Sequence, residues 1–278
     1  MQQDIHLFKT EGAVTVPYSP TLRAAVEAME ESWRAFCALP LEQKKLFPYS
    51  EESAGVGYEY KDTPGATLDL KENFHLTLGR YGWLMQAARA TGLPEAVTLV
   101  ERCRDVALEL QPEVEQFARD AEATCDIPGF ATEVAGSSDI YYVRLIHYFG
   151  DRTPGDETAT AHCDKSGFTF HLYEDTPGLE RLTYDGAWVP MHVSPGETQV
   201  IPNMQLQYRT GGAIKATCHR VVATEASAKT GRYAAVCFVM LKDTPRYNKR
   251  AAGRLQEREP GFNYTCPPEE FAKLFATE

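Results

Sequence analysis

The sequence lacks any run of lysines and arginines. Of its 278 residues 39 are acidic and 28 are basic, so the net charge is -11 and the pI is near 5.2. A protein that binds nucleic acid or an anionic membrane needs a basic patch to neutralise phosphate groups. We therefore expect neither nucleic acid nor a membrane as a partner.

Long apolar stretches and paired cysteine motifs are also missing. No span approaches 20 apolar residues, and the first residues, MQQDIHLFKTEG, carry charges where a secretory signal would be apolar. The seven cysteines are odd in number and none has CxxC spacing, which argues against a disulfide framework or a zinc knuckle. We expect a cytoplasmic protein with reduced thiols.

The front of the chain has helical patterns. Ser19 is a predicted N-cap and Pro20 a first helical residue, followed by apolar residues at helical spacing up to Phe36. A second helix is predicted over 94–124, and Pro112 should kink or split it. Between them, residues 48–79 are rich in glycine, proline and aromatics, which favours a structured loop or lid, with short strands allowed.

From Asp139 onward the pattern changes to short β-branched and aromatic runs separated by turn signals such as DTPG, SPGE and KTG. At least six such runs predict an antiparallel sandwich or barrel. We expect an α+β fold with a helix-rich region 1–130, which includes the lid 48–79, and a strand-rich core 131–278, whose tail 260–275 covers it. With no linker between them, the two regions should pack as one unit.

The segment AHCDKSGFTF contains the first chemical signal. Residues two apart on a strand point the same way, so His162 and Asp164 should converge on one point. His219, in ATCHRVVAT, supplies a third ligand, and two histidines with one carboxylate form the facial set of non-haem Fe(II) oxygenases. Arg232 follows on an apolar strand, where burial requires an anion beside it, although a surface ion pair remains an alternative.

Several motifs together resemble the isopenicillin N synthase-like branch of the Fe(II)/2-oxoglutarate-dependent dioxygenases. They are FCALPLEQKKLF, SAGVGYEY, HCD, GLERLTYDGAWVPM and TGGAIKATCHRVV. The resemblance covers nearly the whole chain and implies a double-stranded β-helix (jelly-roll) core with flanking helices, mainly N-terminal. It also implies that His162, Asp164 and His219 bind iron, that Arg232 holds the distal carboxylate of 2-oxoglutarate, and that Tyr148 assists.

The same resemblance implies the reaction. Fe(II), 2-oxoglutarate and O2 would be used, with ascorbate as a stimulant, and succinate and CO2 would form while a small molecule is hydroxylated, desaturated or cyclised. Halogenating relatives lack the carboxylate ligand, so Asp164 argues against halogenation. We expect a biosynthetic substrate, amino-acid-derived or a specialised-metabolite intermediate, that carries a carboxylate, with Arg144, Tyr142 and Phe168 as its contacts.

Departures from the family pattern leave two alternatives open. The family's Arg-x-Ser is Arg232-Tyr233-Ala234 in this chain, so one hydroxyl that would share the cosubstrate carboxylate is missing. An oxidase of the isopenicillin N synthase type, which does not use 2-oxoglutarate, is the first alternative. A non-catalytic binding protein on the same fold is the second. A further departure, Asn203-Met204 in place of Gly-Asp, concerns the turn before the distal histidine.

Overall fold

A computed structural model describes residues 4–47, 49, 55–61, 70–248 and 259–275. Its helices, in chain order, are α1 (His6–Thr10), α2 (Pro20–Cys37), α3 (Leu41–Lys44), α4 (Tyr81–Thr91), α5 (Pro94–Cys125), α6 (Phe130–Ala135), α7 (Met204–Arg209), α8 (Ser227–Thr230), α10 (Phe262–Thr265) and α11 (Pro268–Ala272), with short 3-10 turns at Leu78–Arg80 and Ser138–Ile140. None of the helices in these ranges combines the length and apolar character needed to cross a membrane.

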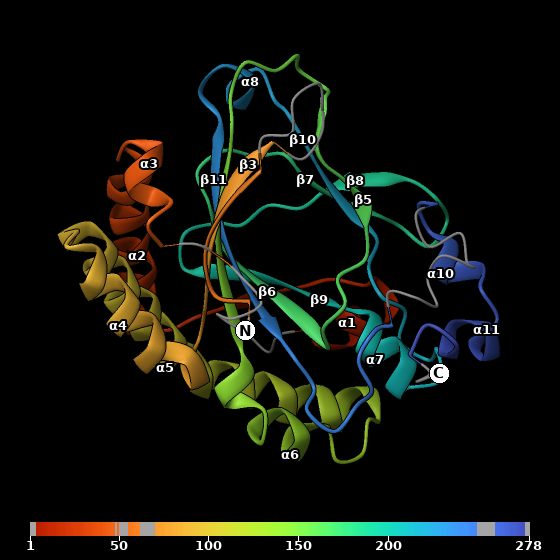
Figure 1. Cartoon of the computed structure of the whole chain (residues 1–278). Coiled ribbons are helices and arrows are strands. Elements are labelled where there is room, and N and C mark those ends of the chain that lie inside the picture. The colour runs from red at the N-terminus through yellow and green to blue at the C-terminus, as the bar shows by residue number, and fades with distance from the viewer. Residues whose placement is uncertain (1–3, 48, 50–54, 62–69, 249–258, 276–278) are drawn as a thin grey trace.

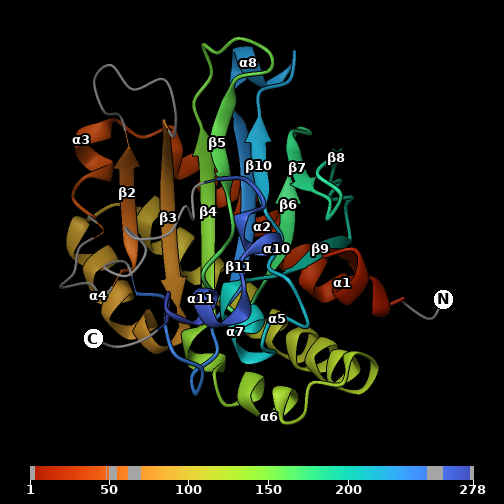
Figure 2. The same cartoon turned by 90° about the vertical axis from the view of Figure 1, so that its right-hand side faces the viewer.

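The strands form two sheets that face each other (Figures 1 and 2). They are β1 (Val14–Pro17), β2 (Gly57–Lys61), β3 (Lys71–Thr77), β4 (Tyr142–Tyr148), β5 (Glu157–His162), β6 (Phe168–Glu174), β7 (Leu179–Leu182), β8 (Trp188–Pro190), β9 (Glu197–Pro202), β10 (His219–Val222) and β11 (Arg232–Val239). One sheet has the order β1-β9-β6-β11-β4-β3-β2 and the other β5-β10-β7-β8. All the pairings are antiparallel, and the predicted α+β double-stranded β-helix is confirmed.

Helices cover the outer face of the seven-stranded sheet (Figure 1). In α2 the Ser19 hydroxyl accepts a hydrogen bond from the Leu22 N–H at 3.3 Å, and Pro20 occupies the first helical position, as the sequence predicts. The apolar stripes of α2 and α5 pack together and against the sheet, with Trp33 and Phe117 among the buried side chains. This layer leaves the space between the two sheets for the site.

Pro112 does not split the second predicted helix. α5 runs for 32 residues from Pro94 to Cys125 with Pro112 inside it. Because proline has no backbone N–H, the carbonyl four residues earlier, which belongs to Leu108, lacks its helical hydrogen bond. The Leu108 side chain is 50% exposed, so this side of the helix faces solvent and water can satisfy the freed carbonyl.

A β-bulge in β6 decides which side chains point between the sheets. Ala235 of β11 pairs with Tyr173, but its neighbour Val236 pairs with His171, so β6 holds one extra residue, Leu172. Before the bulge Phe168 and Phe170 pack towards the helices. After the bulge the inward position falls on Glu174, whose carboxylate meets Arg232.

The segment predicted as a loop or lid contains two strands of the large sheet. β2 and β3 pair with each other, and β3 pairs with β4 through the register Phe74↔Leu145. The remaining residues of 48–79 include 48, 50–54 and 62–69, which lie outside the described residues. The lid, like the division at residue 130, stays a prediction.

Candidate functional site

Three side chains meet between the two sheets. His162 ends β5 and His219 begins β10, and their Cα atoms are directly paired across these strands. Asp164 follows two residues after His162, with 3.5 Å between its Oδ1 and His162 Nε2 and 3.8 Å between its Oδ2 and His219 Nε2. One candidate ligand atom from each residue lies within 4.8 Å of the other two. Two imidazoles and a carboxylate in this arrangement suit one divalent metal ion.

The two histidines are oriented alike by their own strands. The Nδ1 atom of His162 lies 2.7 Å from the carbonyl oxygen of Thr160, and the Nδ1 atom of His219 lies 3.1 Å from that of Thr217. Because a carbonyl only accepts, each Nδ1 carries the proton and each Nε2 is left with a lone pair. The lone pairs of both rings therefore lie on the side of Asp164, which is the protonation pattern that metal ligation requires.

Asp164 is held as an anion. The Thr169 hydroxyl donates to its Oδ2 at 2.7 Å, and the side-chain amide of Asn203 lies 2.7 Å from the same hydroxyl. Burial alone would raise the pKa of Asp164, but the two histidines and Thr169 outweigh it and keep that pKa well below its usual range. Asn203, one of the departures in the sequence, thus lies beside the hydroxyl that contacts Asp164.

A narrow cavity of about 60 Å³ extends from the three ligands into the space between the sheets. Arg232 and Tyr148 line it, as do Lys71 and Leu179. Arg232 Nη2 donates to Glu174 at 2.6 Å, and its Nε donates to the Thr176 carbonyl at 2.9 Å. Its Nη1 group has no hydrogen-bond partner among the described residues, so one face of the guanidinium is available to an anion in the cavity.

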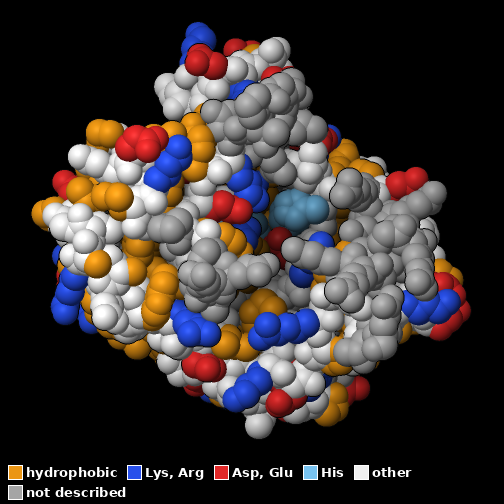
Figure 3. Space-filling view, viewed as in Figure 1, with side chains coloured by type: hydrophobic (Ala, Val, Ile, Leu, Met, Phe, Trp, Pro, Cys, Tyr) orange, Lys and Arg blue, Asp and Glu red, His pale blue; other side chains and the backbone are white. Residues whose placement is uncertain are grey.

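A wider cleft of about 940 Å³ opens from the ligands to the surface. In Figure 3 a histidine side chain lies in a hollow on this face, with lysine and arginine side chains nearby. Arg144 and Phe238 line both the cleft and the narrow cavity, and Tyr142 lines the cleft. Arg144 Nε donates to His75 Nδ1 at 3.2 Å, and its guanidinium lies 4.7 Å from the Phe238 ring centroid. Within the described part of the chain Arg144 has no acidic partner.

Phe168 does not belong to this site. The sequence led us to expect a substrate contact, but the side chain is fully buried on the helix side of β6. Its ring packs against Phe117 at a centroid distance of 5.4 Å and against Phe130 at 5.5 Å. The substrate role predicted for Phe168 is therefore wrong, because strand alternation sends this position away from the cavity.

Other side chains at the site were not singled out from the sequence. His171 lines the narrow cavity, and burial lowers its pKa to about 3, so it is neutral. Arg80 and Arg246 are exposed cations at the cleft, which Lys165 also lines. Strand alternation from Thr169 would have placed His171 on the inner face. The two arginines lie in loops distant in sequence, and no spacing signal connects them to the ligands.

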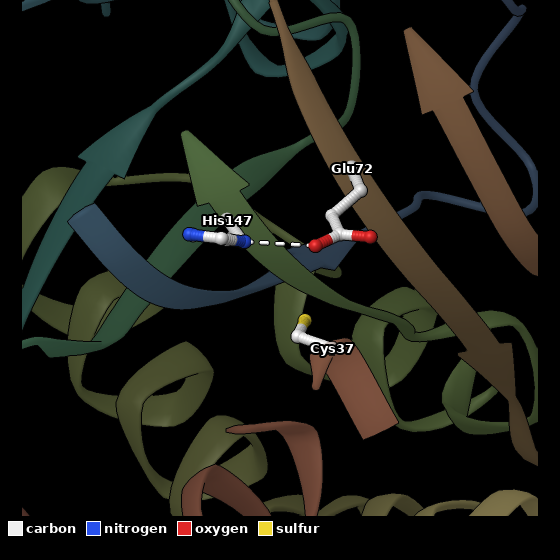
Figure 4. Close-up of side chains that lie close together, drawn as sticks. All are labelled: Cys37, Glu72 and His147. Atoms are coloured by element: carbon white, nitrogen blue, oxygen red, sulfur yellow. Dashed lines mark hydrogen bonds and ion pairs between the residues drawn. The ribbon is translucent and has the colours of Figure 1, made fainter. Parts of the chain in front are cut away.

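A second cluster with metal-ligand residue types lies between the large sheet and the helices. Figure 4 shows Cys37, Glu72 and His147 close together, with His147 Nδ1 2.8 Å from Glu72 Oε1. The other carboxylate oxygen of Glu72 accepts from Lys44 and from the Tyr58 hydroxyl, both at 2.6 Å. A buried ammonium that already neutralises the carboxylate opposes a metal ion, so this cluster ties the helices to the sheet.

Comparison with known sequences gives a family match and one partial relative. Residues 141–240, from β4 to the end of β11, match the sequence model of the 2OG-Fe(II) oxygenase superfamily. The matched part contains the three candidate ligands and Arg232. The chain is also similar to MOXD1 homolog 1 of Drosophila melanogaster, at 36% identity over 96 residues. That match spans 34% of this chain and only 12% of the fly protein.

Solved structures share the fold across most of the chain. A full-length protein of Neurospora crassa, solved in complex with alpha-KG, is 18% identical, with a TM-score of 0.71, and the match covers 96% of this chain and 88% of that one. The dioxygenase for auxin oxidation from rice is 21% identical, with a TM-score of 0.70, over 98% and 92% of the two chains.

Proposed function

We propose that this chain, whose residues 141–240 match the 2OG-Fe(II) oxygenase superfamily, is an Fe(II)/2-oxoglutarate-dependent dioxygenase and that its substrate is a small anionic molecule. Fe(II), 2-oxoglutarate and O2 are the cofactor and cosubstrates of this class. The oxidation of the substrate would be a hydroxylation, a desaturation or a ring closure, with succinate and CO2 as the products of the cosubstrate.

We assign the metal to His162, Asp164 and His219. The donor set fits Fe(II), since both Nε2 lone pairs and an anionic carboxylate lie within 4.8 Å of one another. Bound there, iron would supply the activation of O2 that no protein side chain can provide. The chain's own part is to fix the histidine tautomers through Thr160 and Thr217 and to keep Asp164 charged.

The environment of Arg144 is the observation from which we infer an anionic substrate. An arginine that is only partly exposed would ordinarily have a carboxylate partner, yet among the described residues it donates to the neutral imidazole of His75. Its position where cavity and cleft meet lets a substrate carboxylate bind beside the metal ligands. Burial lowers the pKa of His75 to about 3, so His75 stays neutral and does not repel the guanidinium.

Further cations favour an anion in the cleft. Arg80, Lys165 and Arg246 line it, whereas Asp139 and Asp164 are the acidic residues there among the described ones. In a chain of net charge -11, this local excess of positive charge marks a place for a negative ligand. Complexes of the similar Neurospora crassa protein contain thymine or 5-formyluracil, which supports a ligand of similar small size in this chain.

The test combines oxygen consumption with product analysis. Purified protein with Fe(II) and 2-oxoglutarate should consume O2 and form succinate in equal amounts when the correct small carboxylic acid is supplied. In the variant Arg144→Leu the KM for that acid should rise by about 10- to 100-fold, because a charged hydrogen-bonded pair is lost, while the KM for 2-oxoglutarate stays unchanged. Equal activity of Arg144→Leu and wild type would refute the anionic substrate.

A 2-oxoglutarate-free oxidase remains the second candidate. One observation favours it: Glu174 and Thr176 already take two groups of the Arg232 guanidinium, and Ala234 offers no hydroxyl. Substrate oxidation without succinate would identify this alternative.

For the compartment we propose the cytoplasm, since all seven cysteines are free thiols, a pattern that a reducing environment maintains. A role in biosynthesis and a lid within residues 48–79 belong to the same proposal.

A further inference from the structure

A buried histidine without a partner lies beside the candidate metal ligands. The His171 side chain is on the inner face of β6, its residue is 6% exposed, and its Nε2 atom has no hydrogen-bond partner in the described part of the chain. Buried polar atoms are nearly always hydrogen-bonded in native proteins, because an unsatisfied one loses its contacts with water. Because the residue His171 lines the narrow cavity, the orphaned nitrogen of its ring indicates a ligand that completes it.

The position of His171 indicates which ligand. On the inner face of β6, Thr169 contacts Asp164 at the metal end and Glu174 contacts Arg232 at the other end. His171 lies between these two residues in the strand, and its ring meets the ring of His219 edge to face at a centroid distance of 5.8 Å. A molecule that reaches from the metal ligands to Arg232 must pass this imidazole.

We propose that His171 Nε2 donates a hydrogen bond to an oxygen of the 2-oxo acid half of bound 2-oxoglutarate. This inference rests on the proposed function, because it needs 2-oxoglutarate in the narrow cavity. The distal carboxylate has Arg232 as its partner, so the half near His219 is the one that still needs a donor from β6. His171 is then a positioning residue that selects a cosubstrate with an oxygen at this place.

Three substitutions at one position test the proposal. Gln carries an N–H group near the place of the imidazole Nε2, Asn carries one near Nδ1, and Leu fills similar space without a donor. The dissociation constant of 2-oxoglutarate is measured by calorimetry with Mn(II)-loaded protein without O2, so the readout does not depend on turnover. His171→Leu and His171→Asn should bind about 10- to 100-fold more weakly than wild type, and His171→Gln within about threefold of it.

The matched control is His147→Leu, which removes a histidine that lies outside the narrow cavity, in the cluster with Glu72 and Cys37, and should leave the 2-oxoglutarate affinity unchanged. Mn(II) affinity should be the same in all His171 variants, and saturating 2-oxoglutarate should restore kcat in His171→Leu. Wild-type affinity in His171→Leu, or equal affinities in the Gln and Asn variants, would overturn the inference. Absence of 2-oxoglutarate binding by the wild type would instead refute the proposed function.

Discussion

The contact between Arg232 and Glu174 determines how the role of Arg232 must be tested. The two side chains are only 5% and 3% exposed, and 2.6 Å separates Nη2 from Oε2. Removing one partner of such a pair leaves a buried unpaired charge and typically costs about 3 to 5 kcal/mol. Because a folded domain is stable by only about 5 to 15 kcal/mol, Arg232→Ala should weaken the fold as well as cosubstrate binding.

A double variant separates these two effects. In Arg232→Ala/Glu174→Gln no charge is left unpaired, and the Gln side-chain oxygen can still accept the Val193 N–H that Glu174 now accepts at 3.1 Å. The free energy of unfolding should therefore recover most of the loss. The affinity for 2-oxoglutarate should stay low, by about two to three and a half powers of ten, which is 3 to 5 kcal/mol at about 1.4 kcal/mol per tenfold.

Two measurements decide the outcome. Urea unfolding gives the stability of wild type, both single variants and the double variant, and calorimetry with Mn(II)-loaded protein gives the affinity for 2-oxoglutarate. Glu174→Gln is the control, since it keeps the guanidinium and should bind 2-oxoglutarate at least as tightly as wild type. If the double variant binds 2-oxoglutarate like wild type, Arg232 does not hold the distal carboxylate and the reasoning fails.

Three shorter predictions concern the ligands and the buried charges. Asp164→Ala should abolish metal-dependent thermal stabilisation because a third of the donor set and its charge are lost; an unchanged Fe(II) or Co(II) shift would exclude Asp164 as a ligand. Thr169→Val should lower Co(II) affinity about 10- to 100-fold by freeing Asp164, as measured by absorbance titration; wild-type affinity argues against that support. The pKa of His75 falls from 6.5 in the unfolded chain to about 3 in the folded protein, so the unfolded chain binds more protons and the free energy of unfolding decreases as the pH falls below 6.5. In His75→Leu, urea unfolding should show a free energy of unfolding that depends less steeply on pH between pH 6 and 4, by about 1.4 kcal/mol per pH unit. Parallel pH curves for wild type and variant would contradict this.

The convergence of the three candidate ligands could be anticipated from local rules. Strand alternation places His162 and Asp164 together, and the HRVV motif marks the strand that brings His219 beside them. The Ser19 cap and Pro20 likewise fix the start of α2 through contacts within one turn. In each case the decisive interactions lie close in sequence or follow from the resemblance.

The partners of the buried charges could not be anticipated. Glu174 meets Arg232 only because of the extra residue in β6, and a bulge depends on the register of the neighbouring strand β11. The buried position of β3 could not be predicted for a related reason. A glutamate in sequence suggests a surface position, and the partners that allow Glu72 to be buried, which are Lys44, Tyr58 and His147, are distant in sequence. Such contacts between distant segments are a property of the packed sheet and leave no periodic signal.

The bulge at Leu172 also determines on which face of β6 Glu174 lies. If all of β6 paired regularly with β11, Leu172 would lie opposite Ala235 and every later position would change face. Tyr173 would then turn inward and Glu174 outward, although no chemical group at the site would have been altered. Deletion of Leu172 alone would instead keep His171 opposite Val236 and Tyr173 opposite Ala235, so a strand one residue shorter reaches the same arrangement without a bulge.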